Sequence, residues 1–321
     1  MNANTTVKPV ICRSVGKKYG NNIVALNNIS FEAEYGEIFG LIGPDGAGKT
    51  SIFHILATLA LPSKGSASVL GFDTVSDFRQ IRQLIGYMPG RFSLYQDLTV
   101  EENLRFFATL FNTTVEANYK LVKDIYSHIE AFAKRRAGAL SGGMKQKLAL
   151  SCALIHKPKV LFLDEPTTGV DPVSRKEFWG MLKRLKEQGI TIIVSTPYMD
   201  EATMCDRIAL INRGAFMKID TPAAIVESYA ENLFAVRGNR MANLLKLLRS
   251  HSKVKTSFAF GDVHHVTVES DTSIDEIKRF IDENNSGEVE IYSVEPTIED
   301  CYMWYSLSED KKTEINNKVF K

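Results

Sequence analysis

Residues 43–51 have the types and spacing of a loop that binds phosphate: Gly43, Pro44, Asp45, Gly46, Ala47, Gly48, Lys49, Thr50 and Ser51. They fit the pattern G-x-x-x-x-G-K-[ST] and lie between an apolar run and a helix-forming run. In such a loop, backbone N–H groups surround a polyphosphate, and the positive end of the following helix points at the same charge. Lys49 is expected to reach the phosphates, Thr50 to offer its hydroxyl to Mg²⁺, and Ser51 to add a hydrogen bond.

Two neighbouring carboxylates follow a second apolar run, at residues 159–163. Such a run is typical of a parallel strand buried on both faces, so the acids Asp164 and Glu165 are expected at its carboxyl edge. Asp164 is placed to hold Mg²⁺, and Glu165 to orient or deprotonate a water molecule. Acids after a buried strand often only solvate a loop, but here they share a chain with a phosphate-binding loop.

Two further features are weak evidence for nucleotide binding when taken alone. Ser141, Gly142 and Gly143 open a predicted helix that runs to about residue 155, and a helix N-terminus of this kind is a second anion-binding arrangement. Tyr19 lies in a turn region, where its aromatic face could stack on a nucleotide base or simply pack in the turn.

The composition is that of a globular protein. The 321 residues are enough for two domains, and 44% of them are hydrophobic. Lys and Arg number 39 against 38 Asp and Glu, a balance that argues against a nucleic-acid partner. The four cysteines are far apart and are expected to be buried thiols in a reducing compartment. No run approaches the roughly 20 apolar residues of a membrane span, so we expect a cytoplasmic protein.

The pattern of apolar residues predicts an alternating α/β series that contains a helical insert. The elements expected before the insert are strands at 11–17, 29–33 and 66–72 and a helix at 76–84. The insert covers about 99–140, with Thr99 as a helix N-cap and a second helix over 115–133. The elements expected after Glu165 are helices at 173–188 and 199–204 and strands at 191–195 and 207–212.

Residues 223–306 carry no phosphate-directed motif and are predicted to form a separate, small α+β domain. The expected elements are a strand at 233–237, a helix at 241–248, strands at 254–260 and 263–268, a helix at 274–281 and a strand at 289–294. This order predicts a βαββαβ fold, with Gly261 and Asp262 as a tight turn. Residues 307–321 are polar and charged, and they are predicted to be disordered.

Four motifs together resemble those of an ABC-type ATPase. Residues 43–50, 140–146, 161–166 and 167–172 are similar to its Walker A, signature, Walker B and D-loop. The resemblance covers residues 8–222 and implies a P-loop NTPase cassette with a RecA-like core, an antiparallel β arm and an α-helical insert. Residues 295–300 resemble the closing motif of the accessory domain in ABC exporters of the drug-resistance type.

The resemblance implies ATP and Mg²⁺ as cofactors, and a second cassette that closes head to tail with the first around each ATP. Glu165 is implied as the general base, and Thr50 and Asp164 as Mg²⁺ ligands. The nucleotide-binding residues that it implies are residues 43–51 with Tyr19, Ser141, Gly142, Gly143, Gln146 and Asp171. Of these, Ser141 and Gly143 would contact the γ-phosphate of the nucleotide bound by the partner.

Two positions depart from the family pattern. Gly90 stands where the family usually has glutamine, and Pro197 where it usually has a histidine that contacts the γ-phosphate. Gly90 has no side chain for Mg²⁺ or water, and Pro197 has neither a side-chain donor nor a backbone N–H. Gln96 is close to Gly90 in sequence. ATP binding should survive these losses, whereas hydrolysis at this chain's own site is in question.

The leading functional hypothesis is the ATP-hydrolysing subunit of a membrane exporter, peripheral on the inner face of the cell membrane through separate transmembrane permease subunits. A regulatory subunit that hydrolyses little is an alternative because of Gly90 and Pro197. A soluble mechanical ABC ATPase fits less well, since the insert has no room for a long coiled coil and the chain has one cassette. A P-loop kinase or GTPase would leave the motif at Ser141 unexplained. A heterodimer is favoured over a homodimer.

Overall fold

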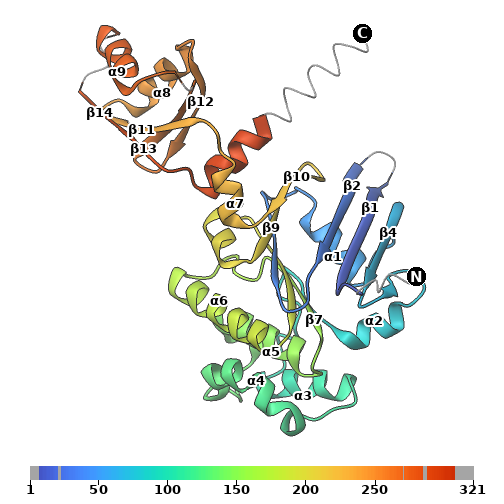
Figure 1. The fold of residues 1–321 in the computed structure, drawn as a ribbon. Coiled ribbons are helices and arrows are strands. Elements are labelled where there is room, and N and C mark those ends of the chain that lie inside the picture. The colour runs from blue at the N-terminus through green and yellow to red at the C-terminus, as the bar shows by residue number, and fades with distance from the viewer. Residues whose placement is uncertain (1–6, 21–22, 270, 285–287, 308–321) are drawn as a thin grey trace. The chain divides into compact units, whose positions relative to one another are not determined.

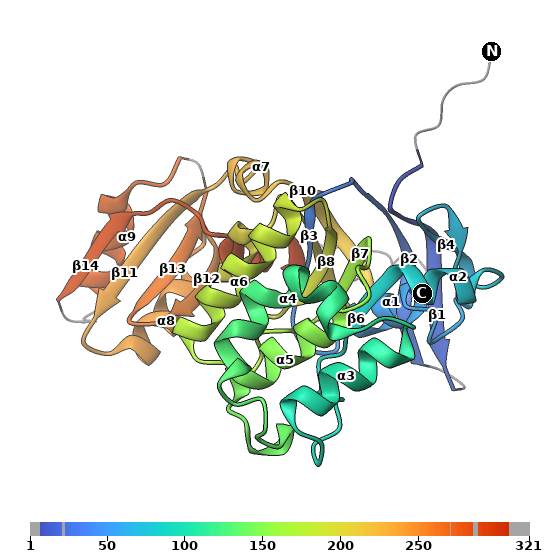
Figure 2. The same cartoon turned by 90° about the horizontal axis from the view of Figure 1, so that it is seen from below.

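The structure is a computed structural model that describes residues 7–20, 23–269, 271–284 and 288–307. The chain divides into two compact units, Met1–Pro222 and Ala223–Lys321, which are drawn in Figures 1 and 2. The phosphate-binding loop and both carboxylates belong to the first unit. The second unit contains the predicted βαββαβ elements.

A six-stranded sheet forms the centre of the first unit, with the strand order β10-β9-β3-β8-β7-β6. Its strands are β3 Ile38–Ile42, β6 Ile85–Met88, β7 Val160–Asp164, β8 Thr191–Thr196, β9 Arg207–Asn212 and β10 Ala215–Asp220. All pairs are parallel except β9 with β10. Every residue of β3, β7 and β8 is buried, as their apolar sequences require of central parallel strands.

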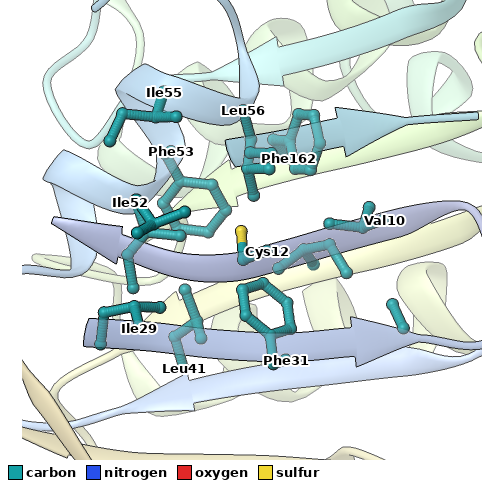
Figure 3. Packing of buried hydrophobic residues seen from close by; sticks show 14 of the residues in the cluster. Val10, Cys12, Ile29, Phe31, Leu41, Ile52, Phe53, Ile55, Leu56 and Phe162 are labelled. Atoms are coloured by element: carbon teal, nitrogen blue, oxygen red, sulfur yellow. The ribbon is translucent and has the colours of Figure 1, made fainter. Parts of the chain in front are cut away.

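A second, antiparallel sheet forms the predicted β arm, with the order β2-β1-β4-β5. Its strands are β1 Val10–Tyr19, β2 Ile23–Ala33, β4 Lys64–Val69 and β5 Phe72–Asp73. Helix α1, Lys49–Leu56, contacts β7 of the central sheet as well as β2 and β4 of the arm. One hydrophobic core therefore joins the arm, the helix and the central sheet, as Figure 3 shows. Phe53 of α1 meets Phe162 of β7 there, edge to face at 6.0 Å.

The helical insert forms as predicted between β6 and β7. It consists of α3 Val100–Leu110, α4 Val115–Glu130 and the 3-10 turn η1 Ala137–Ala139, and the predicted helix α5 Gly142–Leu154 follows it. Thr99 caps α3 in a complete capping box with Glu102, which confirms the predicted N-cap. Helices α3 and α4 both pack against α5, and the buried amide of Asn118 donates to the Ile155 carbonyl at 2.6 Å.

The other helices of the first unit are α2 Phe78–Leu84, α6 Pro172–Glu187 and the 3-10 helix η2 Met199–Met204. The helix predicted at 199–204 is therefore present, but as a 3-10 helix. Strand β10 was not predicted, and all six of its residues are half-buried. A short helix at the boundary of the two units, α7 Pro222–Glu227, was not predicted either.

The second unit has the predicted order of elements: β11 Asn232–Gly238, α8 Met241–Ser250, β12 Val254–Phe260, β13 Val263–Val268, α9 Ile274–Glu283 and β14 Val289–Ser293. Its antiparallel sheet has the order β12-β13-β11-β14, which is the ferredoxin-like arrangement. Helices α8 and α9 cover a core that includes Phe234, Val266 and Ile277. Residues 298–307 form a further helix, so Leu307 is ordered, and the rest of the predicted tail lies outside the described residues.

Across the described ranges, no helix combines the length and the hydropathy that crossing a membrane requires. All four cysteines are buried free thiols, as predicted. Burial raises the pKa of the Cys12 and Cys152 thiols far above its ordinary value, so both act as small apolar side chains.

Candidate functional site

Glycine is required at several positions of the loop that joins β3 to α1. Gly46 and Gly48 have φ angles of +78° and +108°, a region that side chains with a Cβ rarely adopt. A Cβ on Gly48 would lie 2.7 Å from the Ala25 carbonyl oxygen, and a Cβ on Gly43 would lie 2.3 Å from that of Ile211. The backbone at Ala25 and Ile211 therefore packs closely against the loop. Helix α1 begins where the loop ends, and no side chain caps its N-terminal N–H groups.

Lys49 lies under this loop and is only 2% exposed. Its ammonium donates to the carbonyl oxygens of Gly43, at 2.8 Å, and Pro44, at 2.9 Å. It also forms an ion pair with Glu165 Oε1 at 2.9 Å. The structure thus brings together the lysine of the first motif and the second carboxylate of the β7 edge, which are 116 residues apart.

The remaining loop residues surround this lysine. Thr50 and Asp45 are exposed, and Ala47 is buried with its carbonyl accepting from Gly214 N at 2.9 Å. Ser51 lies in the first turn of α1, where its N–H donates to Gly48 O at 3.0 Å. Thr50 is therefore exposed at the start of α1.

Asp164 and Glu165 are held by the adjacent strand β8. Asp164 is buried and accepts a hydrogen bond from Ser195 Oγ at 2.7 Å. The Glu165 N–H donates to Ser195 Oγ at 3.0 Å and to Ser195 O at 3.2 Å. Glu165 itself has a left-handed backbone with φ of +50°, a strain that is common at functional sites. Sequence reasoning missed Ser195, because a serine at a strand end is not distinctive.

Tyr87, on β6, lies near Asp164. Its hydroxyl is buried, and no group in the described part of the chain forms a hydrogen bond with it. Burial, and the charge of Asp164, raise the pKa of Tyr87 well above its ordinary value. The tyrosine is therefore a neutral phenol next to the acidic edge of the sheet.

The two departures from the family pattern lie at the edge of this site. A Cβ on Gly90 would lie 3.8 Å from Asp164 Oδ2 and 3.1 Å from the Asp164 carbonyl. Pro197 directly follows β8, next to Thr196, whose carbonyl accepts from Gly43 N at 3.3 Å. Gln96 instead lies against Gly138 in the helical insert, where its carbonyl accepts from Gly138 N at 2.9 Å.

The signature residues are at the start of α5. Ser141 is exposed and caps the helix, accepting from Met144 N at 3.4 Å. A Cβ on Gly143 would lie 2.9 Å from Ser174 Oγ, and one on Gly142 would lie 3.1 Å from the Gly169 carbonyl. The two glycines therefore allow α5 to approach the loop that follows β7 and the first turn of α6.

The other predicted binding residues belong to different elements from Lys49. Asp171 caps α6 by accepting from Ser174 N at 3.0 Å, and this hydrogen bond lowers the pKa of its carboxyl. Gln146 is half-buried on α5. Tyr19 is exposed at the end of β1, with the Lys17 ammonium 4.8 Å from its ring centre.

A cavity of about 700 Å³ lies between the end of α1, β6 and the helical insert. Its lining is largely apolar and includes Leu59 and Leu110, which are 56% and 59% exposed. At its wall, Phe111 stacks on His156 at 3.8 Å, and His156 Nε2 contacts the Ile85 carbonyl at 2.8 Å. Burial lowers the pKa of His156, so this ring is neutral at pH 7 and adds no charge to the cavity.

The fold and the phosphate-binding loop define a P-loop NTPase cassette. The model of the ABC transporter family matches residues 26–168. The probable multidrug ABC transporter ATP-binding protein YbhF of Escherichia coli (strain K12) is 38% identical over 274 residues, which are 84% of this chain and 46% of that protein. The Nod factor export ATP-binding protein I of Burkholderia orbicola (strain AU 1054) is 41% identical over 226 residues, 70% of this chain and 74% of that protein.

A solved structure gives the same fold. The dimeric structure of a post-hydrolysis state of the ATP-binding cassette MJ0796, bound to ADP and Pi, superimposes with a TM-score of 0.60 at 26% identity, covering 66% of this chain and 98% of that one. The chain therefore belongs to the family of ABC transporter ATP-binding proteins. It spans about half the length of YbhF.

Proposed function

We propose that this chain is the ATP-binding and ATP-hydrolysing subunit of an ABC exporter. The observation that carries this proposal is the position of Lys49, whose buried ammonium lies under a glycine-rich loop and 2.9 Å from Glu165. A buried lysine surrounded by carbonyl and carboxylate oxygens next to a helix N-terminus is suited to neutralise a polyphosphate. The names of the relatives, one a multidrug protein and one an export protein, support an exporter.

The residues at the sheet edge have distinct roles in this proposal. The loop N–H groups and Lys49 bind the phosphates, so the ion pair between Lys49 and Glu165 opens when they enter. Glu165 is then free to accept a proton from the attacking water, and Ser195 keeps Asp164 and the Glu165 backbone in place. Tyr19 offers the exposed aromatic face for adenine.

Thr50 and Asp164 would hold Mg²⁺ beside the phosphates. One carboxylate, one hydroxyl and phosphate oxygens are a ligand set that Mg²⁺ commonly accepts, since it keeps several waters. The described residues contain no cluster of three or more histidine, cysteine or acidic side chains that would form a metal cage by itself. The ion would neutralise charge that develops on the phosphate oxygens.

A second cassette completes the site in this proposal. Ser141 is exposed, and Gly142 and Gly143 leave the N-terminus of α5 uncovered by side chains of their own. These groups would contact the nucleotide of the partner, and the MJ0796 cassette has been solved as a dimer. Because Gly90 and Pro197 leave this chain's own site without two side chains, we favour a partner that differs from this chain.

Membrane subunits would dock at the apolar cavity beside β6. A cavity lined by exposed Leu59, Leu110 and Phe78 suits an amphipathic helix from a membrane protein. This docking would place the chain on the cytoplasmic face of the membrane. The second candidate function, a regulatory subunit that binds ATP but hydrolyses little, is favoured by Gly90 and Pro197 alone.

Lys49→Ala tests the proposal. The variant should bind a fluorescent ATP analogue about 10–100-fold more weakly, because it loses a charge-assisted contact worth roughly 1.5–3 kcal/mol to phosphate inside a loop of backbone dipoles. Lys176→Ala, which removes an exposed lysine of α6, is the matched control and should bind like the parent. Equal affinities for the parent and Lys49→Ala would refute the assignment of the phosphate site.

A further inference from the structure

Glu201 is a buried carboxylate that none of the sequence motifs includes. It lies on η2 and is 3% exposed. Its Oε2 accepts hydrogen bonds from Thr196 Oγ1 at 2.6 Å and from Thr167 Oγ1 at 3.0 Å. A buried charge is costly unless it is paired and hydrogen-bonded, so an acid in this position calls for an explanation.

Arg175 of α6 supplies the opposite charge. Its Nε lies 2.9 Å from Glu201 Oε1, and its guanidinium also reaches the exposed Asp200 at 3.2 Å. The Arg175 guanidinium stacks 4.1 Å above the ring of Tyr198. Burial would lower the pKa of Arg175, but the hydrogen bond and the charge of Glu201 raise it above its ordinary value. The arginine is therefore charged at neutral pH.

The two threonines lead from Glu201 to the proposed catalytic edge. Thr167 follows Glu165 by two residues, in a turn where Thr168 N donates to Glu165 O at 3.2 Å. Thr196 follows Ser195, which holds both acids, and the Thr196 carbonyl accepts from Gly43 N at the start of the phosphate loop. One carboxylate thus connects two separate segments that end at the nucleotide site.

We propose that Glu201 is a positioning residue that fixes the Asp164 and Glu165 carboxylates through Thr167 and Thr196. This inference rests on the proposed function. The Glu201 carboxylate pairs with Arg175 and accepts from two hydroxyls at once, and these directional contacts restrict the movement of both segments. The loss of a group that orients metal ligands typically costs about 10–100-fold in metal affinity or activity.

Glu201→Gln in the full chain tests the inference by separating nucleotide binding from Mg²⁺ binding. The variant should bind fluorescent ADP without Mg²⁺ within about twofold of the parent, because the phosphate loop and Lys49 are unchanged. The Mg²⁺ concentration that half-saturates the Mg²⁺-dependent gain in ATP binding should rise about 10-fold or more, and single-turnover hydrolysis should slow by a similar factor. Thr167→Val, which removes one hydroxyl and keeps the shape, should give a smaller rise in the same direction.

Asp200→Asn is the matched control. It removes a neighbouring charge on the same arginine, but Asp200 has a side chain that is 75% exposed, so the variant should have the Mg²⁺ dependence of the parent. An unchanged Mg²⁺ dependence in Glu201→Gln would overturn the positioning role. So would a loss of Mg²⁺-free ADP binding as large as the loss of Mg²⁺ affinity, because it would mean that the whole site is damaged. A parent chain that fails to bind ATP would instead refute the proposed function.

Discussion

The phosphate-binding edge of the central sheet and the start of α5 differ in how their polar groups are used. At the edge, Lys49, Asp164 and Glu165 each have a partner within the chain. At the start of α5, Ser141 is exposed and only caps its own helix. The first region is organised by contacts within the chain, whereas the second is an exposed helix N-terminus. This difference agrees with our proposal that each nucleotide lies between two cassettes.

The glycines of the two regions are required for different physical reasons. Gly48 is needed for its backbone angle and for the Ala25 carbonyl beside it. Gly143 is needed because α5 packs closely on Ser174, while its backbone angle is ordinary. A side chain at Gly48 therefore changes the shape of the loop, and a side chain at Gly143 pushes two segments apart.

The largest expected effect comes from Ser141→Arg, which tests the start of α5 against the sheet edge by their effects on ATPase activity. In a dimer with a cassette that retains the usual glutamine and histidine, the intact site would be completed by this chain's Ser141. Blocking it should lower steady-state ATPase activity by about 10²–10³-fold, the usual cost of losing one preorganised contact to transition-state charge. Glu165→Gln in this chain should lower it less. A dimer in which Glu165→Gln is the more damaging of the two would reverse the proposed division of roles. Ser76→Arg adds the same charge at an exposed serine of the arm and should leave turnover unchanged.

Gly48→Ala should distort the loop at the phosphate-binding edge and weaken ATP binding there. The strained φ costs about 1–3 kcal/mol and the Cβ would be 2.7 Å from a backbone oxygen, so ATP affinity should fall by about 10–100-fold. Gly46→Ala is the matched control, because it has φ of +78° with open space around the Cβ, and its loss should be smaller. Both affinities are measured by titration with a fluorescent nucleotide. A larger loss for Gly46→Ala would show that close packing against Ala25 does not shape the loop.

Local patterns explain which parts of the fold could be predicted. The β7 strand, the capping box at Thr99 and the order of elements in the second unit follow from apolar runs, periodicity and cap residues that are contiguous in sequence. Strand β10 could not be predicted, because it is an edge strand whose residues are evenly half-buried. Its pairing with β9 decides its conformation.

The site was only partly predictable for a related reason. The motifs place Lys49 and Glu165 in one region, but their ion pair depends on strands that lie side by side only after folding. No pattern in the sequence indicated that Glu201 is buried, since an acidic side chain is usually solvated. Its burial depends on Arg175 and two threonines from separate segments.

The smallest expected effect is that of removing the second unit. We propose that residues 223–306 are a separate domain that nucleotide binding does not need, since every phosphate-directed residue precedes Pro222. Truncation after Pro222 should leave a folded protein whose ATP affinity is within about twofold of the full chain, or less than about 0.5 kcal/mol. A folded truncation that no longer binds ATP would show that nucleotide binding needs the second unit.

The most direct test is the steady-state ATPase rate of the purified full chain without a partner. We predict that it binds ATP but turns it over at about 0.01–0.1 per second, because a typical rate of about 10 per second is reduced about 10²–10³-fold by the missing side chains at Gly90 and Pro197. Pro197→His should raise this rate. Turnover near 10 per second by the chain alone, abolished by Glu165→Gln, would contradict the proposal that this site depends on a different cassette.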